Sequence, residues 1–321
     1  MLYPFLKIFV GLARHVFCRK VIINKPGLLK EKGPLILACS HPNSFLDAVM
    51  LDLLFKEPIW SLTRGDAFLN KFVNKTFFKL KMLPVYRPSE GVENLSENYK
   101  TFDDCMKIFR KNGVVLIFSE GLCENEWHLR SLKKGTARLA IKCQDENIPL
   151  KILPVGLNYS SFSRFGKNVF INFGNLFSVN DVDKNLSDGA RYQAFNSRLF
   201  QELRPLVYEI EKNDKAKQKK LLEIKIPKLT KILLALPAAI GWLLHAPLYF
   251  PIKKIVLKKF KDTVHIDSML IALPLFIYPL YLVLIVLLLF FFIKSWWVLL
   301  LFIILPFTAW SYVQIKGQLD R

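Results

Sequence analysis

The sequence lacks the residue patterns that build metal centres and redox-cofactor sites. Its five cysteines are scattered and odd in number, with neither a CxxC pair nor His and Cys at metal-ligand spacing. This pattern predicts no zinc site and no disulfide framework, and it is typical of a reducing compartment. Glycine-rich dinucleotide and phosphate loops, the HExxH motif and the GxSxG turn are also absent. We therefore expect no metal or redox cofactor.

Acidic residues are few relative to basic ones. Lys and Arg number 46 against 26 Asp and Glu, a formal net charge of +20, so an anionic partner is expected. Nucleic acid is one possibility, but the basic clusters flank apolar stretches, as they do beside anionic lipid headgroups. We therefore expect membrane lipids as the partner and no nucleic acid. The clusters are Arg19-Lys20, Lys212 to Lys220 and Lys253 to Lys261.

Apolar residues, in contrast, are abundant. They make up 52% of the chain, which includes 27 Phe, and a soluble enzyme rarely carries so many. Segment 269–293 has no charged residue and is long enough to cross a hydrocarbon core. A second apolar segment, 296–314, follows after Lys294-Ser295. Because backbone groups in lipid must bond internally, the two are predicted to form a transmembrane helical hairpin.

Two further apolar segments are predicted to lie at the membrane surface. The run 232–250 is interrupted by prolines and a glycine, and the basic segment 251–261 would end outside if the run spanned. A re-entrant or interfacial hairpin is therefore expected there. Residues 1–20 carry apolar residues near helical spacing, which predicts an amphipathic helix in the headgroup region. An ordinary core-packed helix is the alternative, and no cleavable signal peptide is predicted.

The region 21–210 has the pattern of a globular catalytic domain. Apolar runs typical of buried strands occur at 20–26, 34–39, 113–119, 151–159 and 169–177. Helical patterns lie between and after them, at 46–56, 66–80, 92–111, 133–146 and 189–211. This alternation predicts an α/β fold with a mixed, mostly parallel sheet flanked by helices. The basic segment 211–231 is expected to link it to a membrane domain, 232–321.

One segment places a histidine and a carboxylate where a strand ends and a helix begins. It reads Cys39-Ser40-His41-Pro42-Asn43-Ser44-Phe45-Leu46-Asp47, and ligands bind at such strand ends in open α/β sheets. A His can act as general base towards a hydroxyl while a carboxylate fixes its tautomer. Six helical positions would turn the two side chains about 240° apart, so we expect His41 before the helix and Asp47 in its first turn. The alternative is a loop His and an Asp that interacts with the helix dipole.

The order of motifs resembles that of the glycerophospholipid acyltransferase family, also called PlsC-like, whose hallmark is H-x-x-x-x-D. Here the spacing from His41 to Asp47 is one residue longer, similar to a branch that contains glycerol-3-phosphate acyltransferases. The family's second block resembles Arg64-Gly65-Asp66-Ala67-Phe68 and Leu83-Pro84-Val85-Tyr86-Arg87. The resemblance implies that Arg64 and Arg87 hold the acceptor phosphate, for which forked Arg donors are suited.

The third block, F-P-E-G-T-R in the family, is Phe118-Ser119-Glu120-Gly121-Leu122-Cys123 here. Glu120 and Gly121 match and are implied to bind substrate, whereas Cys123 replaces a phosphate-contacting Arg. Lys133 and Lys134 belong to a segment similar to the family's F-K-K-G. The anion is expected to be held instead by Arg64, Arg87, Arg130, Lys133 or Lys134. Leu153-Pro154-Val155-Gly156 resembles the fourth block, so the resemblance covers roughly residues 30–180.

The resemblance implies an O-acyltransferase in which His41 activates the acceptor hydroxyl and Asp47 orients His41. The donor would be acyl-CoA or acyl-carrier protein, and lysophosphatidate is the first choice of acceptor, with phosphatidate as the product in phospholipid biosynthesis. Glycerol 3-phosphate and a lyso-aminolipid are alternative acceptors because the third block is altered, and a catalytically silent membrane scaffold is the alternative from another class. We expect an integral membrane protein with its catalytic domain on the cytoplasmic face of a bacterial inner membrane.

Overall fold

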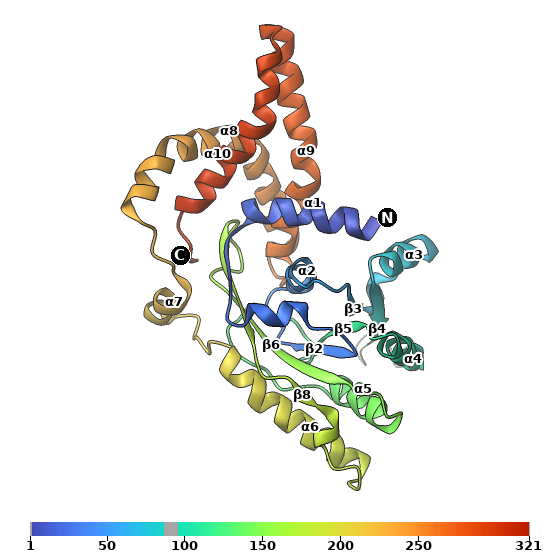
Figure 1. Ribbon diagram of the computed structural model, residues 1–321. Helices are drawn as coiled ribbons and strands as arrows, with labels where there is room; N and C mark the ends of the chain where they lie inside the picture. Colours follow the sequence, from blue (N-terminus) through green and yellow to red (C-terminus); the bar gives the residue numbers. More distant parts are fainter. Residues whose placement is uncertain (1, 87–95, 321) are drawn as a thin grey trace.

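A globular α/β domain is followed by a group of C-terminal helices, two of which project away from it (Figure 1). The structure is a computed structural model in which residues 2–86 and 96–320 are described. Arg87, for which a phosphate contact was expected, lies outside the described residues, so its role stays a prediction.

Eight strands form one sheet in the described part of the chain, in the order β1-β7-β6-β2-β5-β3-β4 with β8 beside β6. Strand β6 pairs antiparallel with β7 and β8, and the other pairs are parallel. The mixed, mostly parallel sheet predicted from the sequence is confirmed. The strands are β1 (Cys18–Ile23), β2 (Leu35–Cys39), β3 (Ile59–Arg64), β4 (Met82–Val85), β5 (Val114–Phe118), β6 (Lys151–Tyr159), β7 (Lys167–Phe173) and β8 (Phe177–Ser178).

Helices cover both faces of this sheet, which is why its central strands are continuous apolar runs. In β2, Leu35 and Leu37 point into one core and Ile36 and Ala38 into the other, as expected from the two-residue period of a strand. The first core is closed by α1 (Leu2–Phe17), α2 (Phe45–Leu54) and the start of α9 (Ile266–Ile293). The second is closed by α4 (Glu97–Arg110), α5 (Lys134–Asp145) and α6 (Asp188–Leu203).

Short elements complete the domain: η1 (Pro26–Lys30), η2 (Gly65–Ala67), α3 (Lys71–Lys79), η5 (Val179–Asp181), η6 (Arg204–Leu206) and α7 (Lys215–Leu222). The helical pattern at 66–80 is therefore divided between η2 and α3. No strand was predicted at residues 59–64, yet β3 forms there between β5 and β4. Its residues mix polar and apolar side chains, and the neighbouring strands supply the backbone partners that decide its structure.

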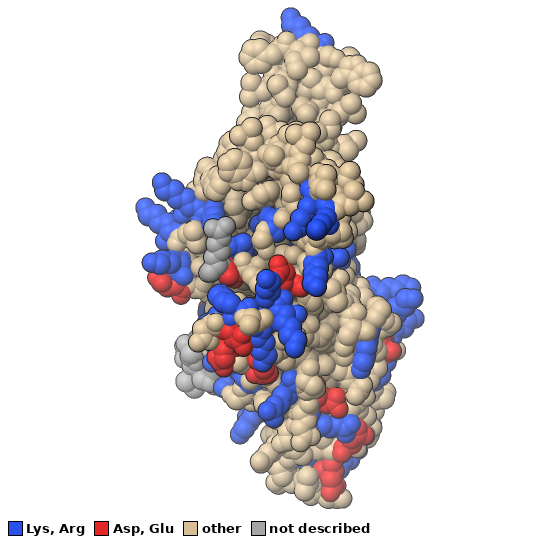
Figure 2. Space-filling view, turned by 90° about the vertical axis from the view of Figure 1, so that its left-hand side faces the viewer, with Lys and Arg blue, Asp and Glu red and all other residues tan. Residues whose placement is uncertain are grey.

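The C-terminal helices are α8 (Lys228–Phe260), α9, the short η7 (Trp296–Leu300) and α10 (Leu301–Ile315). Three segments among the described residues are long and apolar enough to cross a membrane: α8, α9, and η7 with α10. Helices α9 and α10 form the predicted hairpin, which is nearly free of charged side chains up to its tip, whereas Lys and Arg gather near its base (Figure 2). These features associate the protein with a membrane.

The run 232–250 does not double back, so the expected hairpin within it is wrong. It belongs to the single helix α8, which contains three prolines and arches beside the base of the α9–α10 hairpin (Figure 1). Proline removes a backbone donor and bends a helix without always ending it. Gly241 allows α8 to pack closely on α10, because a Cβ there would lie 2.2 Å from the carbonyl oxygen of Thr308. An interfacial position for α8 stays a prediction.

Candidate active site

His41 and Asp47 lie together beyond the end of β2, in the segment that leads into α2. His41 Nδ1 is 2.9 Å from Asp47 Oδ2. The completely buried Asp47 carboxylate also accepts hydrogen bonds from the Asn43 backbone N at 2.8 Å and the Tyr159 hydroxyl at 2.7 Å. Because an ionised carboxylate only accepts, Nδ1 carries the proton and Nε2 keeps its lone pair. This arrangement matches that of a general base with an orienting acid.

The β2–α2 loop (residues 40–44) gives this pair its geometry. His41 precedes α2 and Asp47 lies in its first turn, as the spacing predicted, and Pro42 lies in the turn that enters the helix. Ser44 is the N-cap residue, but its side chain makes no capping hydrogen bond. Its φ of 52° is one that L-residues rarely adopt, so contacts outside the loop must hold it. They are a hydrogen bond from Ser44 N to Cys123 Sγ at 2.9 Å and one between Ser44 Oγ and His265 Nδ1 at 2.6 Å.

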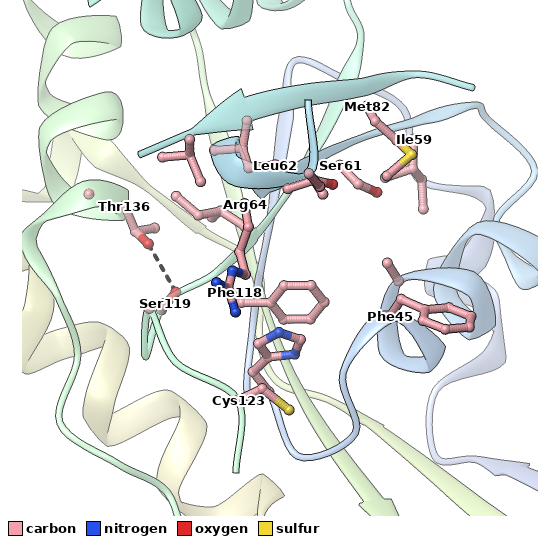
Figure 3. Close-up of a pocket in the computed structure, with 18 of the residues that line it drawn as sticks. Phe45, Ile59, Ser61, Leu62, Arg64, Met82, Phe118, Ser119, Cys123 and Thr136 are labelled. Carbon is pink, nitrogen blue, oxygen red and sulfur yellow. Dashed lines mark hydrogen bonds between the residues drawn. The ribbon is translucent and has the colours of Figure 1, made fainter. Parts of the chain in front are cut away.

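The imidazole of His41 is held by an aromatic neighbour as well. Its ring stacks on Phe118, with the centroids 3.7 Å apart and the planes 11° from parallel. Phe118 ends β5, directly beside Cys39 at the end of β2, and lies at the centre of the site (Figure 3). The His41 side chain is 13% exposed. Stacking and the bond to Asp47 together leave the ring little freedom to rotate.

Glu120 supports the loop that carries His41. It is 4% exposed, its Oε1 accepts a hydrogen bond from the backbone N of His41 at 3.1 Å, and burial raises its pKa to about 7. The resemblance implied that Glu120 binds substrate, but among the described residues Glu120 does not line the cleft at His41. Its neighbour Gly121 does line the cleft. Gly121 has a φ of +68°, and a Cβ there would lie 2.8 Å from Lys133 Cγ, which explains the glycine.

Cys123 serves the same loop. It is 8% exposed, and burial raises the pKa of its thiol, whereas a nucleophilic cysteine needs a lowered pKa. Its sulfur accepts the hydrogen bond from the backbone of Ser44. The residue that replaces the family's Arg is therefore a buried support of the loop. Among the described residues, no cluster of three or more His, Cys, Asp or Glu could hold a metal ion.

A cleft of about 2170 Å³ opens at His41. Its lining includes the basic residues Arg64, Lys133, Lys134 and Arg138. Arg64 extends towards Phe118, while Ile59, Leu62 and Met82 form part of an apolar wall (Figure 3). Arg64 also bonds Asp66, from Nε to Oδ1 at 3.1 Å. Arg64, Lys133 and Lys134, for which contacts to the substrate anion were expected, all line this cleft, and their role as one anion site stays a prediction.

Helix α1 supplies a further wall of this cleft, which sequence reasoning did not foresee. Four of its residues line the cleft: Tyr3, Leu6, Lys7 and Val10. Its other face is open, with Phe5, Ile8 and Leu12 exposed at 66%, 66% and 70%. An exposed apolar stripe of this kind suits a helix that lies in a membrane interface. The cleft therefore borders the surface that is predicted to contact lipid.

Tyr159 and His265 are site residues that sequence reasoning missed. Tyr159 ends an apolar strand without any motif, and burial raises its pKa well above the ordinary value, so it stays a hydrogen-bond donor to Asp47. His265 lies 224 residues after His41 in the chain and lines the same cleft. Burial, with the nearby charges of Arg64 and His41, lowers the pKa of His265. No local signal could have identified either residue, because the fold alone brings them to His41.

Comparison with known proteins gives a family match. Residues 20–158 match the protein family described as Acyltransferase. This stretch is an acyltransferase-family domain. The matched residues include the His41–Asp47 pair, Arg64 and the block at 118–123, so the match confirms the family that the motifs predicted. The match supports acyl transfer as the reaction of this domain.

A solved structure is also similar to the chain. It is the crystal structure of the 1-acyl-sn-glycerophosphate acyltransferase PlsC from Thermotoga maritima, with 12% sequence identity and a TM-score of 0.40. The similarity covers 64% of this chain and 81% of that one. No protein of curated function matches the sequence. At this identity the likeness says nothing about which acceptor the acyltransferase domain uses.

Proposed function

We propose that the protein transfers a fatty acyl group from an acyl thioester to the free hydroxyl of lysophosphatidate, which yields phosphatidate for phospholipid biosynthesis. One observation carries the proposal. The lining of a single cleft includes His41 of the His41–Asp47 pair, several cationic side chains, and apolar residues, some of which belong to α1. This combination matches an acceptor that has a hydroxyl, a phosphate and an acyl chain.

The reaction is a direct transfer. His41 Nε2 takes the proton of the acceptor hydroxyl, the oxygen attacks the thioester carbonyl, and the thiolate of the donor leaves and receives the proton. Asp47 keeps Nδ1 protonated and stabilises the imidazolium that forms. An acyl-enzyme is not needed, and the raised thiol pKa of Cys123 argues against one at that residue. The donor is acyl-CoA or acyl-carrier protein, both of which are anionic and suit a basic protein.

Arg64, Lys133 and Lys134 are the proposed phosphate ligands. All three line the cleft, and they replace the function of the family's Arg at the position of Cys123. An Arg offers forked donors to phosphate oxygens, and each Lys offers a compact charge. Holding the phosphate positions the hydroxyl near His41, and positioning of this kind contributes several kcal/mol to lowering a barrier.

Helix α1 favours a lipid acceptor over glycerol 3-phosphate, which is water-soluble. One face of α1 lines the cleft while Phe5, Ile8 and Leu12 are exposed on another. A lysophospholipid in the bilayer could therefore reach His41 sideways along the interface, with its chain against the apolar wall. Glycerol 3-phosphate has no use for this route.

We place the catalytic domain on the cytoplasmic face of the membrane, the inner membrane of a bacterial cell. The basic clusters Lys212 to Lys220 and Lys253 to Lys261 lie outside the α9–α10 hairpin, whose tip carries Lys294 alone. Short positively charged segments stay on the cytoplasmic side of a membrane. A fluorescent protein fused after residue 321 should therefore fluoresce, because it folds in the cytoplasm; a dark fusion with full expression would reverse the orientation.

The proposed activity is tested with detergent-purified protein and labelled acyl-CoA or acyl-carrier protein, each with lysophosphatidate, glycerol 3-phosphate and a lyso-aminolipid. We expect transfer to lysophosphatidate, reduced about 10²–10⁴-fold in H41A through loss of the general base. Arg198→Ala, a surface variant away from the cleft, is the matched control. Turnover with another acceptor instead would replace lysophosphatidate. Transfer no greater than that of H41A with every acceptor would favour the catalytically silent scaffold.

A further inference from the structure

The first residues of α9 contact the β2–α2 loop directly. His265 Nδ1 and Ser44 Oγ are 2.6 Å apart, and the Asn43 side chain donates to Asp267 Oδ2 at 2.7 Å. Ser268 Oγ donates to the backbone carbonyl of Asn43 at 3.5 Å. Asn43 and Ser44 are the residues between His41 and Asp47 whose backbone sets the distance between the catalytic pair. A helix from the membrane hairpin therefore holds the centre of the catalytic segment.

A buried ion pair reinforces this contact. Asp267 and Lys167 are both completely buried and pair with one another. Lys167 begins β7, so the pair joins the hairpin to the sheet at the same point where Asn43 meets Asp267. Burying two charges costs desolvation energy that apolar side chains of similar size would avoid. Stability alone therefore explains such a pair poorly. A need to hold α9 in one defined position on the sheet explains it better.

The segment after α10, at the other end of the hairpin, is attached to Asn168, the second residue of β7. Asn168 Nδ2 donates to Gln318 Oε1 at 2.6 Å, three residues beyond the end of α10. Arg19 donates from Nε to the carbonyl of Gln314 at 3.0 Å and from a terminal guanidinium nitrogen to Asn168 Oδ1 at 3.1 Å. Both ends of the hairpin are thus tied to the start of β7. A shift of the hairpin would move the β2–α2 loop with it.

We propose that His265 and Asp267 are positioning residues for His41, so that the membrane hairpin is a working part of the acyl-transfer site as well as an anchor. This inference rests on the proposed function. Ser44 holds a φ that L-residues rarely adopt, and such a conformation persists only where surrounding contacts impose it. Without the contacts from α9 the loop relaxes and His41 moves away from its productive place. A displacement of about 1 Å is enough to lower a rate about 100-fold.

The test uses two variants of the full-length protein and one control. H265A removes the partner of Ser44. K167M/D267L removes both buried charges together, which avoids an unpaired charge, and also the partner of Asn43. The control is H245A, since His245 Nε2 bonds the Tyr278 hydroxyl at 3.0 Å between α8 and α9, away from the β2–α2 loop. We expect kcat to fall about 10–100-fold in both variants with little change in KM for either substrate, because positioning and not binding is lost. H245A should keep its activity.

A second readout does not require activity. Cys123 accepts the hydrogen bond of Ser44 N, whereas Cys105 and Cys143 lie in the core on the other face of the sheet. Maleimide labelling, followed by peptide mass spectrometry, should label Cys123 several-fold faster in H265A and K167M/D267L than in the wild type. Cys105 and Cys143 should stay protected.

The outcomes separate the two proposals. If the wild type transfers no acyl group, the proposed function fails, and Cys123 labelling still reports whether α9 holds the loop. Wild-type kcat and unchanged labelling in both variants would overturn the positioning role. Equal acceleration at all three cysteines would overturn it too, since the contacts would then serve only general stability.

Discussion

The globular domain buries its apolar side chains, whereas the α9–α10 hairpin exposes many of its own. In the domain, Leu37 and Leu116 are 0% exposed. In the hairpin, Leu280 and Phe291 are exposed at 70% and 74%, whereas the polar Ser311 is completely buried. The domain hides apolar surface from water. The exposed apolar and buried polar side chains of the hairpin are the arrangement expected of helices that meet hydrocarbon.

The two regions also bury their carboxylates differently. Asp47 is surrounded by hydrogen-bond donors without a permanent charge. In the proposed reaction, His41 becomes positively charged only when it takes up a proton. Asp267 is paired with the buried ammonium of Lys167. An acid that must respond to a proton on its partner needs the first environment, and an acid that fixes a structural contact suits the second. The difference separates a chemical role from a positioning role.

The largest expected effect contrasts Leu37→Arg with Leu284→Arg. An Arg at Leu37, which is completely buried in the sheet, would be an unpaired charge in the core and should prevent folding. Leu284 in α9 is 57% exposed, and an Arg near the centre of a bilayer costs only about 2.5–3.5 kcal/mol, because its side chain snorkels to the interface. Yield and elution of monodisperse protein from detergent-solubilised membranes would measure both. Equal losses would contradict the contrast.

A smaller effect is expected in the pH dependence of stability. Glu120 is a buried acid of the domain that titrates, whereas the exposed apolar residues of the hairpin do not. Burial raises its pKa from 4.5 to about 7, so the folded state prefers the protonated form. The resulting stability is fully present below pH 4.5 and is lost as pH rises through about 7, up to about 3 kcal/mol in total. Thermal unfolding followed by fluorescence from pH 4.5 to 8 should show this decline in the wild type.

Glu120→Gln should remove that part of the decline, since its amide does not titrate. Glu97→Gln, at a partly exposed ion pair with Lys100, is the matched control and should keep the wild-type slope. Parallel curves for the wild type and E120Q would show that Glu120 is not responsible.

The smallest effect is expected from Tyr159→Phe, which tests how much the hydrogen bond from the Tyr159 hydroxyl contributes to the orientation of Asp47. The substitution removes the hydroxyl that donates to Asp47 Oδ1 at 2.7 Å and leaves the ring in place. We expect kcat to fall about tenfold, equivalent to about 1.4 kcal/mol for a lost bond to a charged group. Tyr281→Phe, which removes a hydroxyl that donates to the Leu244 carbonyl away from the cleft, is the control. A wild-type kcat in Y159F would mean that His41 and Asn43 suffice to orient Asp47.

Features that depend on near neighbours in the chain were predictable. The apolar runs at 34–39, 113–119 and 151–159 became the central strands β2, β5 and β6, since buried strands need continuous apolar residues. The spacing of His41 and Asp47 sufficed to place one before α2 and the other in its first turn. The hairpin followed from the length and uninterrupted apolarity of its segments.

Features that depend on contacts between distant parts of the chain were not predictable. Strand β3 exists because β5 and β4 flank it, and Glu120 faces the loop because β5 and β2 end side by side. The prolines of α8 suggested a break, but packing against α10 is compatible with one curved helix.

Two features were decided along the chain itself: which regions are apolar enough to meet a membrane, and how far apart His41 and Asp47 lie. Both depend only on side-chain polarity and on spacings of a few residues. Tertiary structure decided what surrounds that pair. Tyr159, Glu120, Cys123 and the start of α9 reach the loop from separate elements, and only the folded sheet and the docked hairpin bring them within hydrogen-bond distance. Hydrogen bonds act over about 3 Å, so no pattern along a chain of 321 residues can encode such a set of neighbours in advance of the fold.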